Sequence, residues 1–160
     1  KEIELSFITD ISSKTITIDD EKYERIILNL LSNAIKYTPK GKRVCVRLYL
    51  NRDRVYVEVR DEGIGIPQSK QKVIFEPFGQ VENSLTRNAG GTGIGLTFVK
   101  FLLERMDGEI FLESEEGKGS TFTVSFPDRL TIHTGECEAE YEKTDSRLFY
   151  LADIEFSDLT

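Results

Sequence analysis

Residues 29–38 read Asn-Leu-Leu-Ser-Asn-Ala-Ile-Lys-Tyr-Thr, and the interpretation of the whole chain starts from this stretch. Asp19 and Asp20 offer an N-cap and a first-turn acid, so a helix is predicted from there to about Tyr37. Pro39 ends it, because a proline pushes the residue before it out of helical dihedrals. The quoted stretch is therefore the second half of a long helix.

One side of this helix combines two amides with a cation. On a wheel of about 100° per residue, Asn33 and Lys36 lie within about 40° of Asn29. An amide carbonyl is a hard oxygen ligand suited to Mg²⁺, and Lys36 can neutralise a phosphate. Alternatively both asparagines cap backbone groups or face water, since amides are only weakly disfavoured within helices. The adjacent apolar sector, expected to face the core, holds Ile27, Leu30, Leu31 and Ala34.

The turn before Asn29 presents no carboxylate to this side. Arg25 falls on the same side of the wheel, whereas Glu24 points away from it. An enzyme that hydrolyses ATP needs a base there to activate water. The pattern favours transfer of a phosphoryl group to a protein acceptor over hydrolysis.

Alternation of apolar and polar residues predicts short strands in the rest of the chain, joined by turns rich in glycine and proline. The predicted strands are 3–8, 15–18, 44–50, 55–59, 109–114 and 120–126, and a second helix is predicted from about Thr92 to Met106.

Two glycine loops have the chemistry of a nucleotide site. Asp61 heads the first, Asp-Glu-Gly-Ile-Gly-Ile-Pro, where its carboxylate would accept from the amino group of adenine but not from the carbonyl of guanine. A common turn headed by aspartate is the alternative. The second loop, 90–96, opens the second helix, where free N–H groups and glycines admit an anion. It matches neither the P-loop nor the dinucleotide-binding pattern. A tight helix entry would explain one or two of its glycines, but not four.

Between these loops, an aromatic unit at 74–78 precedes the polar residues 80–88. This segment is predicted to be a lid over the ligand, with Arg87 available to a phosphate. A surface loop without a ligand is the alternative.

Together these segments resemble, in order and spacing over residues 1–127, the ATP-binding catalytic domain of sensor histidine kinases, within the superfamily of gyrase, Hsp90 and MutL. The matching motifs are the N box at 29–38, the G1 box at 61–67, the F box at 75–78, the G2 box at 91–96 and the closing strand motif at 119–122.

The resemblance implies an α/β two-layer sandwich, a mixed, mostly antiparallel sheet with helices on one face. It implies ATP and Mg²⁺ as cofactors, with the metal on Asn33 and Asn29, and catalytic contacts from Asn33, Lys36 and Arg87. The implied nucleotide contacts are Asn29, Asn33, Lys36, Tyr37, Asp61, Gly63, Gly65, Ile66, Phe78, Gly91, Thr92, Gly93, Ile94, Gly95, Leu96 and Ser120.

The implied activity is that of a protein-histidine kinase in a bacterial two-component system. The domain would donate the ATP γ-phosphoryl group to a histidine on a separate dimerisation and phosphoacceptor domain, with a response regulator downstream. The single histidine, His133, lacks a helical acceptor context and is expected at the surface. The acceptor is therefore expected on other sequence.

Charge and composition limit the partners and the location that we expect for the chain. The net charge of −7 argues against nucleic-acid binding, which needs a basic surface. No apolar run reaches the ~20 residues that cross a bilayer, so the chain is expected in the cytoplasm, with Cys45 and Cys137 as free thiols. Residues 128–160 form an acidic tail whose apolar residues alternate from Leu148 to Phe156. The tail could add an edge strand or dock a partner.

Two rival functions remain open on the sequence. A gyrase- or Hsp90-like ATPase would hydrolyse ATP without an acceptor, and it would want the carboxylate that the Asn29 side lacks. A non-catalytic ATP-binding module would carry the same binding residues and would differ only in forming no phosphohistidine.

Overall fold

The computed structural model describes residues 2–77 and 94–128, which form one mixed sheet under two helices. The strand order in the sheet is β1-β2-β3-β5-β4. In chain order the elements are β1 (Glu4–Thr9), α1 (Asp20–Tyr37), β2 (Arg43–Asn51), β3 (Arg54–Asp61), the short 3₁₀ helices η1 (Gln68–Lys70) and η2 (Val73–Phe75), α2 (Gly95–Arg105), β4 (Glu109–Glu115) and β5 (Gly119–Pro127).

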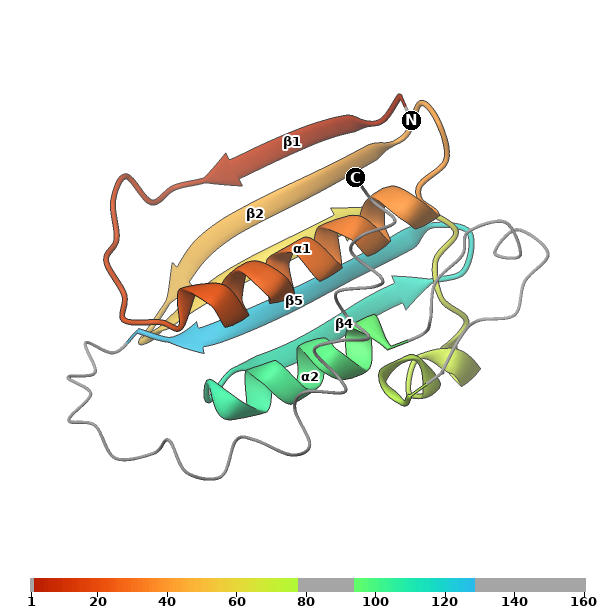
Figure 1. Cartoon of the computed structure of the whole chain (residues 1–160). Helices are drawn as coiled ribbons and strands as arrows, with labels where there is room; N and C mark the ends of the chain where they lie inside the picture. Colours follow the sequence, from red (N-terminus) through yellow and green to blue (C-terminus); the bar gives the residue numbers. More distant parts are fainter. Residues whose placement is uncertain (1, 78–93, 129–160) are drawn as a thin grey trace.

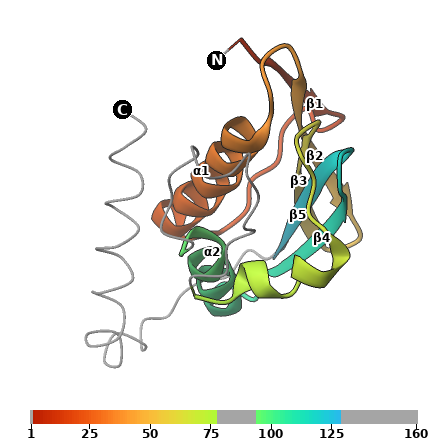
Figure 2. The same cartoon turned by 90° about the vertical axis from the view of Figure 1, so that its right-hand side faces the viewer.

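The sheet is mixed but mostly antiparallel. β1 pairs with β2 in parallel, and the pairs β2–β3, β3–β5 and β4–β5 are antiparallel. Helices α1 and α2 both lie against the same face of the sheet (Figures 1 and 2). The expected two-layer α/β architecture is confirmed.

Helix α1 begins and ends where its local signals predict. The Asp19 carboxylate accepts from the backbone N–H of Lys22 at 3.0 Å and so caps the first turn. Thr38, ahead of the proline, is extended, and its N–H donates to Ala34 O at 3.1 Å. The residue before proline thus leaves the helix after one last backbone bond.

One predicted strand is wrong, and the second predicted helix is present with a shorter described range. Residues 15–18 form no strand but part of the connection from β1 to α1. Ile16 and Ile18 are half-buried and Thr15 and Thr17 exposed, so the alternation reflects burial without strand pairing. Helix α2 spans Gly95–Arg105, and its N-cap residue Ile94 has φ −101° and ψ −22° and makes no side-chain cap hydrogen bond. Thr92 itself lies outside the described residues.

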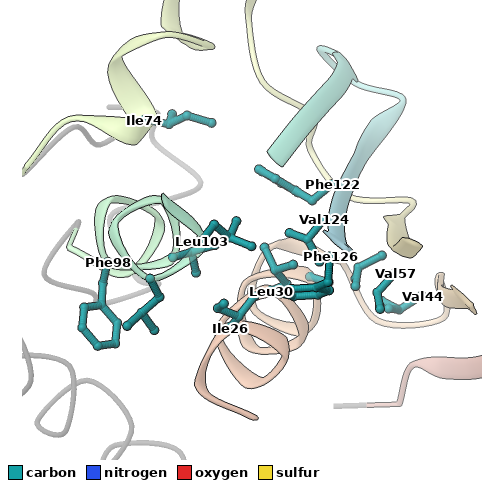
Figure 3. Close-up of a cluster of buried hydrophobic side chains, with 14 residues drawn as sticks. Ile26, Leu30, Val44, Val57, Ile74, Phe98, Leu103, Phe122, Val124 and Phe126 are labelled. Atoms are coloured by element: carbon teal, nitrogen blue, oxygen red, sulfur yellow. The ribbon is translucent and has the colours of Figure 1, made fainter. Parts of the chain in front are cut away.

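The hydrophobic core fills the space between the helices and the sheet (Figure 3). Helix α2 contributes Phe98 and Leu102, both 0% exposed, and α1 contributes Ile26 and Leu30. The sheet contributes Val44, Val57, Val59, Phe122, Val124 and Phe126.

The buried face of α1 differs from the expected one in a detail that bears on the site. Asn29 is only 5% exposed and lies among the core residues, whereas Ile27 and Leu31 are half-buried at the edge of the cluster. The buried face is thus centred closer to the amides than the wheel predicted. Within the described ranges, neither helix has the length and apolar character needed to span a membrane.

Candidate nucleotide-binding site

The two asparagines of α1 touch each other and the start of α2. Asn33 Nδ2 donates to Asn29 Oδ1 at 3.3 Å, as their spacing of one helical turn allows. Asn29 also packs on the backbone of α2, since a Cβ added to Gly95 would lie 2.4 Å from Asn29 Nδ2. Asn29 therefore holds the side-chain amide of Asn33 in place through its own contact with α2.

This arrangement fits Mg²⁺ at Asn33 better than at Asn29. The Asn33 amide nitrogen donates to its neighbour, so its carbonyl oxygen is the atom that could bind a cation. The carbonyl of Asn29 already accepts a hydrogen bond and is buried. A single protein ligand is enough for Mg²⁺, because the ion keeps several water ligands and is also coordinated by the phosphates of the substrate.

The last turn of α1 brings a cation next to the first glycine loop. Lys36 and Tyr37 are half-buried, with Lys36 Nζ 5.2 Å from the centroid of the Tyr37 ring. The N–H of Ile64 donates to Tyr37 O at 3.4 Å. This bond joins the helix that carries Asn33 and Lys36 to the loop that follows Asp61.

Asp61 ends β3 as a buried, anchored carboxylate. It is 6% exposed, and its Oδ1 accepts from the N–H of Gly63 at 2.9 Å and from that of Ser120 at 3.3 Å. Burial raises the pKa of Asp61 above its ordinary value of 3.8, and the two backbone hydrogen bonds partly oppose that rise. Both of these bonds use Oδ1, so Oδ2 is the oxygen that could accept from a ligand.

Asp61 belongs to a row of polar side chains across three strands. In the sheet register it pairs with Ser120 of β5, which in turn pairs with Ser114 of β4. The next row is apolar, with Val59 beside Phe122. The polar row therefore continues the core-facing side of the sheet at the end nearest the glycine loop.

The glycines of this loop are required by close approach. A Cβ on Gly63 would lie 2.6 Å from Asp61 Oδ1 and 2.6 Å from Tyr37 O. Gly65 has a φ of +66°, and its Cβ would lie 2.0 Å from Glu115 O. These contacts hold the loop against both the end of α1 and the β4–β5 turn, and Ile66 continues the loop half-buried.

Two residues that the sequence did not single out complete this end of the site. The N–H of Ile66 donates to Ser114 Oγ at 2.8 Å. Gln71 Nε2 donates to Ile66 O at 3.1 Å and to Ser114 O at 2.9 Å. A serine at an inward position of β4, in line with Ile110 and Leu112, was the available signal for Ser114.

The second glycine loop is described only from Ile94 onward. Ile94 is 3% exposed, Gly95 is buried against Asn29, and Leu96 is half-buried. Thr97 Oγ1 donates to Phe75 O at 3.1 Å and so ties α2 to η2. The other predicted contacts of the F and G2 boxes and of the lid lie outside the described residues: Phe78, Arg87, Gly91, Thr92 and Gly93.

Residues 18–130 match the family described as "Histidine kinase-, DNA gyrase B-, and HSP90-like ATPase". The circadian input-output histidine kinase CikA of Synechococcus elongatus is 43% identical over 118 residues, which cover 74% of this chain and 16% of that protein. The sensor histidine kinase WalK of Bacillus subtilis is 37% identical over 131 residues, or 79% of this chain and 21% of that protein. The chain thus spans about a fifth or less of the length of these relatives.

Solved structures agree with the sequence relatives. The nucleotide-free catalytic domain of histidine kinase ThkA superposes with a TM-score of 0.68 at 26% identity, covering 79% of this chain and 80% of that one. Full-length ShkA in complex with AMPPNP gives 0.68 at 29% identity, covering 78% of this chain and 25% of that one. The chain belongs to the histidine kinase-, DNA gyrase B- and HSP90-like ATPase family, and within it to the ATP-binding catalytic domains of sensor histidine kinases.

Proposed function

We propose that this chain binds Mg-ATP between α1, the 61–67 loop and the start of α2, and that it donates the γ-phosphoryl group to a histidine on a separate phosphoacceptor domain. The observation that carries the proposal is the buried Asp61 carboxylate, held through Oδ1 by two backbone N–H groups. Its Oδ2 would accept from the base. A response regulator downstream and a cytoplasmic location belong to the same proposal.

Adenine would enter at Asp61. An exocyclic amino group can donate to Oδ2, whereas the carbonyl of guanine would face a second acceptor at that position. Gly63 and Gly65 fix the path of the loop beside Asp61, because their backbone packs directly against Asp61 Oδ1, Tyr37 O and Glu115 O. Base recognition therefore comes from one end of the sheet, and the phosphates would extend along α1.

The triphosphate would lie along the polar side of α1. Mg²⁺ on the Asn33 carbonyl would draw charge from the β- and γ-phosphates, and Lys36 would balance the remaining charge one turn further on. We also include Arg87 and the 91–96 loop as phosphate contacts, on the strength of their sequence pattern. In this arrangement the chain orients the phosphates and neutralises charge, and no side chain of its own becomes covalently attached.

The transfer itself is a substitution at the γ-phosphorus. A ring nitrogen of the acceptor histidine forms the new P–N bond, the P–O bond to the β-phosphate breaks, and ADP leaves with the electron pair. The positions of two α1 carboxylates favour transfer to histidine over hydrolysis of ATP, because neither can activate a water molecule beside Asn33. Glu24 is exposed, and Glu21 Oε1 is paired with Arg25 Nη2 at 3.5 Å, so neither is placed as a base beside Asn33.

The test uses Asn33→Ala and Asn33→Asp in the intact kinase that supplies the acceptor histidine. Both variants should fold like the parent but form no acid-labile phosphohistidine with Mg-ATP, because the metal ligand is lost or its charge is changed. Glu24→Gln, on the exposed side of the same helix, is the matched control and should phosphorylate normally. Phosphohistidine at the parent level in Asn33→Ala would refute the assignment, and phosphate release without an acceptor would favour the ATPase alternative.

A further inference from the structure

Ser114 has no role in the function proposed above, yet it lies in the same row as the residues that would bind the base. Asp61, Ser120 and Ser114 are cross-strand neighbours on β3, β5 and β4. Ser114 Oγ lies 2.9 Å from Ser120 Oγ, within hydrogen-bond distance. In this hydrogen bond one of the two hydroxyls donates its proton and the other accepts it.

The other contacts of Ser114 settle that choice. Its Oγ accepts from the N–H of Ile66 at 2.8 Å and donates to the carbonyl oxygen of Gly119 at 3.0 Å. A carbonyl oxygen can only accept, and a serine hydroxyl has one proton. If that proton turned to Ser120, two lone pairs would face each other between Ser114 and Gly119. The proton of the Ser114–Ser120 bond must therefore come from Ser120.

The consequence reaches the base site. With its proton committed to Ser114, Ser120 has only lone pairs to offer a ligand. Asp61 beside it is a carboxylate and likewise only accepts. The acceptors of this row match the amino group of adenine and oppose the carbonyl of guanine.

We propose that Ser114 is a specificity-determining positioning residue: by holding the proton of Ser120 away from the ligand, it makes the base site reject guanine. The inference rests on the proposed nucleotide function and deepens it. Gln71 supports the geometry, since its Nε2 bridges Ile66 O and Ser114 O and keeps the loop beside β4. Without the Ser114 hydroxyl, the Ser120 proton is released and can donate to guanine.

The experiment measures the dissociation constants of ADP and GDP for the 160-residue chain by calorimetry. Ser114→Ala should lower the preference for ADP over GDP by about tenfold, the effect of roughly one hydrogen bond, mainly through tighter GDP binding. Ser114→Thr keeps the hydroxyl and should keep the preference. Ser69→Ala makes the same chemical change on an exposed serine of η1 and serves as the matched control.

A double-mutant cycle separates this role from a purely structural one. In a Ser120→Ala background, Ser114→Ala should leave the ADP/GDP ratio unchanged, because Ser114 acts through Ser120. Equal weakening of both nucleotides by Ser114→Ala in the parent chain would overturn the proposal. If Ser114→Ala does not fold, Ser120→Ala alone must lower the ratio, and an unchanged ratio overturns the proposal.

The same measurements distinguish a failure of the proposed nucleotide binding from a failure of the role of Ser114. If the parent chain binds neither nucleotide, the nucleotide function falls and the role of Ser114 falls with it. If the parent chain prefers ADP while Ser114→Ala retains the full preference, nucleotide binding stands and only the role of Ser114 is refuted.

Discussion

Replacing Gly65 by alanine should damage the protein far more than the same replacement at Gly41. Both glycines have left-handed backbone, with φ values of +66° and +81°. A Cβ on Gly41 would meet nothing within 4 Å, whereas one on Gly65 would lie 2.0 Å from Glu115 O and 2.7 Å from Glu115 C. The pair therefore separates the conformational penalty from the loss of close packing.

The magnitudes follow from the contacts. Each substitution should destabilise the fold by about 1–2 kcal/mol, since an L side chain is disfavoured in left-handed backbone. At Gly65 the loop must also move away from the β4–β5 turn by more than an ångström. That movement breaks the bonds from Gly117 N–H to Ile64 O at 2.7 Å and from Ile66 N–H to Ser114 Oγ at 2.8 Å. At about 1 kcal/mol for each bond, Gly65→Ala should lose roughly 2 kcal/mol more than Gly41→Ala.

The assay has two parts, urea unfolding followed by circular dichroism and ADP titration of the folded protein. The midpoint should fall further for Gly65→Ala, with the slope of unfolding unchanged. ADP affinity should drop at least about tenfold for Gly65→Ala and stay at the parent value for Gly41→Ala, because only the first displaces the loop beside Asp61. Equal unfolding free energies for the two variants, or parent-like ADP binding by Gly65→Ala, would refute the reasoning.

Three further predictions concern Asp61 and the core. Because burial raises the pKa of Asp61, ADP affinity should weaken on acidification while the pH is still above 3.8, and Asp61→Asn should abolish this pH dependence; an unchanged profile in Asp61→Asn would place the titration elsewhere. In the nucleotide-free protein, the raised pKa means that the folded state binds the Asp61 proton more tightly than the unfolded state does. The protonated Asp61 therefore stabilises the fold fully below pH 3.8, and this stabilisation is lost as the pH rises through the raised pKa; urea unfolding across this pH range measures it. Leu102→Ala, at a position 0% exposed, should lower the unfolding free energy by about 2–5 kcal/mol, while Leu28→Ala, at 45% exposure, should change it by under about 1 kcal/mol; similar urea midpoints would contradict this.

The parts predictable from sequence are those set by local chemistry. The cap at Asp19 and the proline after Thr38 define α1, and alternation defines β2 to β5. The strand predicted at residues 15–18 is absent because alternation reports burial, and Ile16 and Ile18 are half-buried in a connection that pairs with no strand. Helix α2 was recognisable from its apolar periodicity, whereas the glycines ahead of it carry no local signal that fixes its first residue at Gly95.

The candidate site shows the same division. Asp61 and Asn33 are recognisable because a residue type in a short pattern suffices to suggest a ligand. The burial of Asn29 depends on the approach of Gly95 in another helix, which no local pattern contains. Ser114 depends on the register of β4 against β5 and of β5 against β3. Such neighbours become visible only when strands far apart in the chain are aligned.

The pairing of Asp61 with Ser120 joins residues 59 positions apart, and this separation has a consequence for how freely the intervening chain can change in length. The entropy lost on closing a loop grows only with the logarithm of its length, so doubling the loop adds about 0.6 kcal/mol. Insertions between η2 and α2 would therefore leave the base end of the site almost as stable as before. The polar row on β3, β5 and β4 therefore sets the base end of the site independently of the length of the segment between η2 and α2.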